Sequence, residues 1–152
     1  MQLTLHADYA LRVLLYLGSQ PAGRVVSTQE IGDVYGISTH HLVRVVRTLS
    51  QKGYVAVSAG RSGGVSLARE ASRIGIGDVV RSAELNLNVV ECFDVKTNTC
   101  PIVAACELKS VLGEALGAFL SVLDRYTLAD LLDGRHRTRL MQIFENSAGR
   151  SA

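Results

Sequence analysis

Three cysteines are the most distinctive chemical group in this 152-residue chain. Cys92, Cys100 and Cys106 have the spacing C-x7-C-x5-C, and no cysteine precedes them. Thiolates bind soft metals and iron–sulfur clusters, and they also form redox disulfides. The sequence has no C-x2-C knuckle, so the spacing disfavours a zinc ribbon or a ferredoxin-type cluster.

Three interpretations of these cysteines remain open from their spacing alone. They are buried free thiols, or two of them form a redox disulfide, or all three bind a metal or cluster whose fourth ligand comes from elsewhere. Residues 86–105 keep no helical period, and a loop allows ligands to converge. Cys106 lies at the expected start of a helix, whose dipole favours the thiolate.

A second chemical group lies on a predicted helix over residues 38–52. Its apolar residues recur at i, i+3, i+4 and i+7 and are expected to face the core: Leu42, Val45, Val46 and Leu49. The opposite face carries hydroxyl, imidazole and guanidinium groups, which suit base edges and phosphates. The candidate DNA contacts are Ser38, Thr39, His40, His41, Arg44 and Arg47, with Thr28 on the preceding helix. An ordinary solvated basic face is the alternative.

The surrounding pattern indicates a helix-turn-helix. A first helix is expected over residues 4–19. Ser27 and Glu30 match a capping box for a short second helix that ends near Tyr35. Gly36 stands where a left-handed C-terminal cap belongs, and Ser38 can cap the next helix. Two short helices joined by a tight turn that contains glycine form this motif.

A β-hairpin is expected directly after the helix-turn-helix. Residues 54–58 and 65–67 alternate in hydrophobicity, and a glycine-rich tip that carries Arg61 joins them. A hairpin in this place is a wing, and Arg61 can reach a minor groove or a phosphate. Its alternative role is that of an exposed turn residue. Helix-turn-helix and wing together favour DNA binding.

The second half of the chain predicts a dimerisation helix. A helix over residues 74–85 precedes the cysteine loop, and a longer one follows over residues 106–125 with an unbroken apolar stripe. A small winged domain cannot cover so long a stripe, so we expect this helix to pack against a second subunit. The alternative is a long core helix within one chain. A short helix over residues 127–132 closes this half. The expected fold is mainly α, a winged helix-turn-helix plus this long helix.

Charge divides the chain into three segments. The total is +2, but residues 1–73 carry 8 basic and 4 acidic side chains, residues 74–133 carry 4 and 9, and residues 134–152 carry 4 and 1. We expect a DNA-binding domain, a cysteine-loop and dimerisation segment, and a basic flexible tail over these ranges. The start lacks the basic region of a signal peptide, and no apolar run approaches the roughly 18 residues of a membrane span. A cytoplasmic protein without membrane contact is expected.

The sequence resembles a family of dimeric winged-helix iron–sulfur transcription regulators of bacteria, which includes NsrR, IscR and RirA types. The likeness is greatest to the nitric-oxide-sensing NsrR type. It covers nearly the whole chain, and the ensemble of matching segments is specific. The matching segments are 3–4, 8–12, 36–38, 63–64, 76–80, 91–93, 100–101, Cys106, 119–120 and 126–131.

The resemblance implies a homodimeric repressor that binds a near-palindromic double-stranded DNA operator. It implies an iron–sulfur cluster, [4Fe–4S] rather than [2Fe–2S], held by Cys92, Cys100 and Cys106. In members of this type a carboxylate on the other subunit's first helix completes the site. Asp8 matches it, and His6 is a competing donor. Nitric oxide would be the signal, with iron or cluster status, as in RirA-type members, the alternative.

The sequence departs from the family pattern at two positions. Lys109 stands where IscR-type members have a histidine ligand. Ala59 stands where many members have an arginine just before the wing, which leaves the operator sequence open. An iron–sulfur electron carrier or redox enzyme is disfavoured because no substrate-site residues gather, so we expect no enzyme. A clusterless thiol regulator would be colourless after anaerobic purification.

Overall fold

The computed structural model describes residues 2–60 and 63–148 of the chain. It is mainly helical with one two-stranded antiparallel hairpin, which confirms the expected fold class. The helices are α1 (Leu5–Ser19), α2 (Thr28–Tyr35), α3 (Thr39–Gln51), α4 (Ile76–Ala83), α5 (Glu107–Leu123), α6 (Leu128–Leu131) and α7 (Gly134–Ala148). The strands are β1 (Val55–Ser58) and β2 (Gly64–Leu67), and three 3-10 turns span Ala71–Arg73, Glu91–Phe93 and Val103–Ala105.

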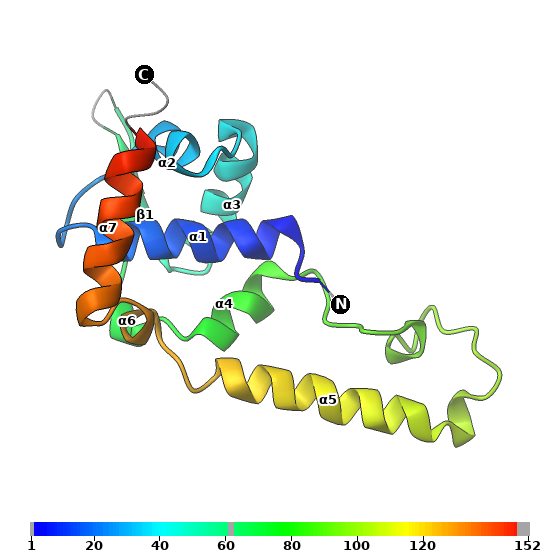
Figure 1. Cartoon of the computed structure of the whole chain (residues 1–152). Coiled ribbons are helices and arrows are strands. Elements are labelled where there is room, and N and C mark those ends of the chain that lie inside the picture. Colours follow the sequence, from blue (N-terminus) through cyan, green and yellow to red (C-terminus); the bar gives the residue numbers. More distant parts are fainter. Residues whose placement is uncertain (1, 61–62, 149–152) are drawn as a thin grey trace.

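Helix α1 lies at the centre of the molecule. In Figure 1, α2 and α3 lie on one side of it, α4 and α5 lie on the other, and α7 crosses its C-terminal end. The Thr4 hydroxyl caps the start of α1 by accepting from the Ala7 amide at 3.2 Å. Ala7, Ala10 and Val13 have no exposed surface, because their small side chains let the neighbouring elements approach closely.

The turn between α2 and α3 has the expected glycine cap. Gly36 adopts a φ of 65°, the left-handed conformation that glycine accepts most easily. The next amide, that of buried Ile37, donates to the Gly32 carbonyl at 3.0 Å. A Cβ added at Gly32 would lie 2.7 Å from the Ile37 carbonyl oxygen, so this position also requires glycine.

The capping expected around this motif forms only in part. The Ser27 hydroxyl accepts from the Glu30 amide at 3.0 Å, but the Glu30 carboxylate accepts from Tyr16 Oη at 2.7 Å and from Arg24 instead of reaching back. Burial and this carboxylate raise the pKa of Tyr16 to about 12. Ser38 occupies the N-cap of α3, but its side chain makes no capping hydrogen bond. Tertiary partners therefore replace part of the local capping.

The hairpin packs against the end of α3. Val55 pairs with Leu67 and Val57 with Val65, so the strands have the register of a short antiparallel ribbon. Beyond β2, the Arg69 guanidinium donates to the Gly53 carbonyl at 2.7 Å and to that of Lys52 at 3.1 Å. Those carbonyls lie just past the last turn of α3, where a cation is favourable.

Helix α5 is attached to α4 at its C-terminal end by a bidentate ion pair. Arg81 donates to the two carboxylate oxygens of Asp124 at 2.5 and 2.7 Å. This guanidinium lowers the pKa of Asp124, so the pair persists until the pH falls below the usual range of an aspartate. A capping box of Thr127 and Asp130, which sequence analysis missed, then starts α6. Among the described residues, no helix combines the length and the apolar character needed to cross a membrane.

The flexible tail expected from residue 134 is wrong for residues 134–148, which form α7. Phe144 is only 6% exposed, and its ring centroid lies 4.9 Å from that of Tyr16 and 5.5 Å from that of Tyr35. Arg137 donates to the carbonyls of Ser19 and Gln20 at the end of α1, at 2.9 and 2.8 Å. Residues 149–152 lie outside the described part.

Replacing Phe144→Ala is expected to destabilise the folded chain by about 3 kcal/mol. The substitution removes a buried aromatic side chain that contacts both α1 and α2. Chemical denaturation monitored by circular dichroism measures the change. Ile143→Ala, at a position that is 49% exposed on the same helix, should cost less than about 1 kcal/mol. Equal effects of the two substitutions would contradict the packing of α7.

Replacing Gly36→Ala should destabilise the chain by about 1–2 kcal/mol, because a Cβ is strained at positive φ although open space surrounds it. The matched control is Gly113→Ala in α5, where a Cβ also meets open space but the backbone is helical. That change should stabilise by about 0.5–1 kcal/mol. Thermal unfolding of both variants compares them, and a neutral Gly36→Ala would refute the requirement for glycine.

Candidate functional site

Helix α3 exposes the face that the sequence assigned to DNA. Leu42, Val45, Val46 and Leu49 are buried, as their spacing predicted. His40, His41, Arg44 and Arg47 on the other faces are exposed. The Thr39 hydroxyl donates to the Gln29 side chain on α2 at 2.9 Å and so fixes the start of α3 against α2. The apolar face of α3 therefore determines which side chains reach solvent.

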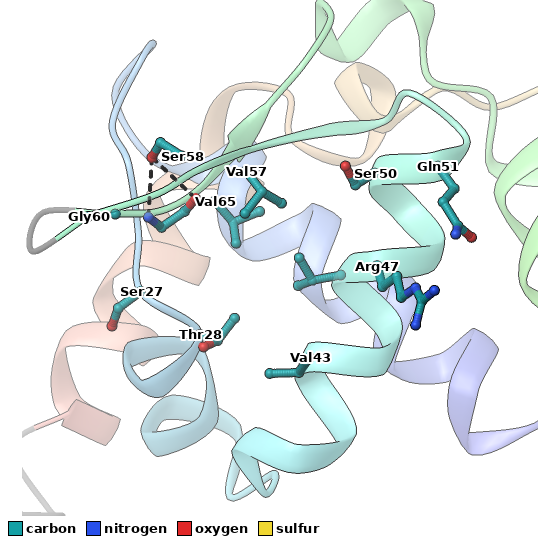
Figure 2. A pocket seen from close by; sticks show the side chains of 13 residues that line it. Ser27, Thr28, Val43, Arg47, Ser50, Gln51, Val57, Ser58, Gly60 and Val65 are labelled. Carbon is teal, nitrogen blue, oxygen red and sulfur yellow. Dashed lines mark hydrogen bonds between the residues drawn. The ribbon is translucent and has the colours of Figure 1, made fainter.

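A concavity of about 540 Å³ lies between α2, α3 and the hairpin. Figure 2 shows Thr28 on α2 and Val43 on α3 pointing toward each other across it, with Val57 on the hairpin at its far end. Arg47 also lines this space. Thr28 and Arg47 were predicted DNA contacts, whereas Val43 and Val57 were not named as candidates. Val43 is an apolar residue on a helix face that otherwise carries polar groups, and Val57 continues the apolar alternation of the hairpin.

A second concavity, of about 400 Å³, lies between α3 and the first turns of α1. It contains the predicted contacts His41, Arg44 and Arg47. The residues opposite them, His6 and Tyr9, come from α1, and the ring centroids of Tyr9 and His41 are 6.2 Å apart. No pattern in the sequence predicted that α1 borders the exposed face of α3.

Arg61, the predicted wing contact, lies outside the described residues, which omit 61–62. The described part of the hairpin ends on either side of it, at Gly60 and Gly63, next to the larger concavity. Its contact with DNA stays a prediction.

Helix α5 presents an unpartnered apolar ridge. In the single chain none of its residues is buried. Leu108 and Val111 are 63% and 59% exposed, and Val122 is 45% exposed. Along one side, exposed side chains recur at i, i+4, i+7 and i+11: Val111, Ala115, Ala118 and Val122. The opposite side of the stripe, toward α4, is half-buried.

The cysteine loop projects past the N-terminal end of α1 (Figure 1). All three cysteines are free and half-buried. Cys92 lies in a 3-10 turn, and Cys106 is the N-cap of α5, as expected. The Glu91 carboxylate accepts from the Thr99 amide at 2.8 Å and from its hydroxyl at 2.7 Å.

The bonds between Glu91 and Thr99 lower the pKa of Glu91 and join the neighbours of Cys92 and Cys100. This link was not predicted, because the sequence separation of eight residues has no helical or strand signature. It holds the two ends of the loop segment between the first two cysteines together.

The four predicted ligands do not form a site within one chain. Among residues 2–60 and 63–148, no three His, Cys, Asp or Glu side chains lie close enough to hold a metal ion. Asp8 instead pairs with Arg12 on the next turn of α1, at 2.7 Å. The competing donor, His6, is in contact with the Thr48 hydroxyl through Nε2 at 3.1 Å.

A polar contact connects the start of α1 to the entrance of the cysteine loop. The Thr4 amide donates to the Glu84 carboxylate at 2.8 Å, and its hydroxyl lies 3.2 Å from the same oxygen. Glu84 is the C-cap of α4, directly before the loop. The segment that carries Asp8 is therefore fixed to the segment that leads to Cys92.

Comparison with known proteins identifies the family. The model of the Rrf2 family, described as iron-dependent transcriptional regulators, matches residues 3–134. The chain is 45% identical over 147 residues to the HTH-type transcriptional regulator NsrR of Shouchella clausii, covering 97% of this chain and 99% of the relative. It is 46% identical over 135 residues to the regulator of the same name in Bacillus subtilis, covering 89% and 92%.

Solved structures agree with this assignment. CymR of B. subtilis, the global cysteine regulator, has a TM-score of 0.68 at 25% identity, over 86% of this chain and 95% of that one. IscR of T. potens has a TM-score of 0.69 at 28% identity, over 87% and 86%. These relatives are transcriptional regulators and not enzymes, as expected for this chain. The chain belongs to the Rrf2 family of iron-dependent transcriptional regulators.

Proposed function

We propose that this chain is a homodimeric, DNA-binding transcriptional repressor that senses nitric oxide through an iron–sulfur cluster. Exposure of the basic face of α3 between two concavities is the observation that carries the DNA-binding half of the proposal. An α-helix fits the major groove of B-DNA, so α3 is the recognition helix. The α3 helices of two protomers then enter successive major grooves of a near-palindromic operator.

The chemistry along α3 supports a division of labour at the interface. Thr39, His40 and His41 lie in its first turn, where hydroxyl and imidazole groups can contact base edges or phosphates. Arg44 and Arg47 follow in the middle of the helix, where guanidinium groups can bind phosphates or the acceptor edge of a guanine. Ser38 and Thr28 flank these groups at the two helix N-termini.

The ridge on α5 supports a dimer. Its valines and alanines are exposed in one chain, and small side chains let two helices approach closely. A two-fold axis across this ridge would cover it with the same ridge of a second copy. Such a dimer also fits a near-palindromic operator.

Replacing Val111→Asp is expected to dissociate the dimer without unfolding the chain. Each dimer loses two buried valines and their packing. This loss weakens the free energy of dimerisation by about 3 kcal/mol and raises the dissociation constant of the dimer at least a hundredfold. Sedimentation velocity measures the mass. Ser110→Asp adds the same charge at an exposed position off the apolar stripe and should leave the dimer intact. A dimer that survives Val111→Asp would exclude this ridge as the interface.

The donor set fits an iron–sulfur cluster in chemical type. Cys92, Cys100 and Cys106 supply three thiolates, and the loop that carries them makes no buried core contact in one chain, so it can reorganise around a ligand. We propose Asp8 of the partner subunit as the fourth ligand, with [4Fe–4S] as the cluster. When bound, the cluster supplies an iron with a weaker oxygen ligand, which is open to a small molecule such as nitric oxide.

The residues of the chain connect this site to DNA binding. Arg12 orients the Asp8 carboxylate, and the Thr4–Glu84 bond holds the same end of α1 at the entrance of the cysteine loop. A change in the loop therefore acts on α1, and α1 packs directly against α3. Relocation of α1 would alter the spacing of the two recognition helices and release the operator.

A second candidate signal is iron or cluster status. The description of the family as iron-dependent favours it. It uses the same three cysteines and the same route through α1, and it differs only in what removes the cluster.

Anaerobically purified full-length protein tests both signals on an operator-containing duplex in a gel-shift assay. Nitric oxide is expected to abolish binding, while absorbance at visible wavelengths reports cluster loss. Release of the operator by a chelator, with nitric oxide ineffective, would select the iron signal.

Cys106→Ser should give colourless protein that binds the operator weakly, whereas Ser110→Ala, one turn further on, should retain colour and response. A Cys106→Ser variant with full colour and response would contradict the proposed ligand set.

A further inference from the structure

The smaller concavity, beside α1, has the composition of an anion site. Two guanidiniums and two imidazoles line it, and none of its eight lining residues is acidic. The nearest carboxylate along α1, that of Asp8, is paired with Arg12. Among the ion pairs of the described residues, none involves Arg44 or Arg47. The two guanidiniums of this concavity therefore have no carboxylate partner among the described residues.

Contacts between two helices give this concavity a defined shape. The Thr48 hydroxyl donates to the Arg44 carbonyl at 3.3 Å, so its oxygen accepts from His6 Nε2, 3.1 Å away. Tyr9 lies against the His41 ring. The first turns of α1 are thus fastened to α3 beside the guanidinium of Arg44.

The dimensions of DNA indicate the ligand. A helix with its side chains is about 10–12 Å wide and the major groove is about 12 Å wide, so a recognition helix fills the groove. The sugar–phosphate backbones of the two strands then lie along its two flanks. One flank of α3 borders the concavity with Thr28 and the hairpin, and the other borders the concavity with His6 and Tyr9.

We propose that the concavity between α1 and α3 binds a backbone phosphate of the operator strand opposite the one that meets α2 and the wing. Arg44 and His41 contact the phosphate, and His6 is a positioning residue that acts through Thr48. This site rests on the DNA binding proposed above. It makes α1 a part of the DNA interface.

The site has a consequence for regulation. His6 and Asp8 are two residues apart, and such residues point to nearly opposite sides of a helix. One turn of α1 therefore presents the proposed cluster ligand on one side and borders the phosphate site on the other. A signal at the cluster that displaces this one turn of α1 would therefore weaken the contact with the phosphate.

Operator duplexes with single neutral methylphosphonates test the site. The operator is selected from a random duplex pool by the anaerobically purified full-length protein, and binding is measured by fluorescence anisotropy. Two sensitive positions per half-site are expected, one on each strand across the major groove. Each should weaken binding about tenfold, as loss of a charge-assisted hydrogen bond does.

Arg44→Ala is expected to weaken binding about tenfold and to remove the sensitivity on the α1-side strand only. Thr28→Ala should affect the other strand, and Lys52→Ala, a matched loss of charge outside both concavities, should leave both sensitivities in place. Inorganic phosphate at constant ionic strength should compete no better than chloride. Stronger competition, absent in Arg44→Ala, would show a site for free phosphate and overturn the proposal.

Two further outcomes separate this site from the proposed function. A selected operator with no sensitive phosphate on the α1-side strand, or with a pattern unchanged by Arg44→Ala, overturns the site alone. A selection that recovers no duplex overturns the DNA binding on which the site rests.

Discussion

Burial of α1 on nearly all sides is the constraint on which the rest of the molecule depends. Its alanines and valine at positions 7, 10 and 13 have no exposed surface, and α3, α4, α6, α7 and the hairpin all pack around it. A close-packed interior does not deform gradually, so a shift of this helix must be shared by its neighbours. The same helix begins next to the cysteine loop and ends beneath α7, which makes it the mechanical centre of the chain.

The sequence predicted the helix-turn-helix and the hairpin correctly because the signals for these elements are local. The i, i+3, i+4 pattern of α3, the glycine at position 36 and the alternation of the hairpin each determine structure within a few residues. The failures have one physical cause. Glu30 accepts hydrogen bonds from Tyr16 and Arg24 instead of from the start of its own helix. Phe144 packs against two tyrosines that are more than a hundred residues away in the sequence. The fold brings such partners together, so no local sequence pattern predicts them.

The candidate site was predictable to a different extent in its two parts. The residues of α3 follow from periodicity, but the role of α1 as their neighbour depends on how two helices cross. The cysteines could be located by composition, yet within residues 2–60 and 63–148 they do not lie close enough together to hold a metal ion. The loop that carries them has no helical or strand period, so no local pattern predicts their arrangement. The division of charge between the two halves agrees with this proposal, since the basic segment carries the face proposed to meet the phosphates and the acidic one holds the loop.

One feature of the core bears on how such a regulator can change over generations. No hydrophobic side chain between residues 84 and 127 is fully buried, so this segment contributes little to the interior of a single chain beyond the half-buried side of α5 that includes Leu123. Substitutions in this segment therefore escape the strongest selection against unfolding, whereas substitutions in the buried core of the helix-turn-helix domain do not. New inputs can therefore arise in the loop by small steps, and a lineage can exchange the stimulus it answers while it inherits the same set of target genes.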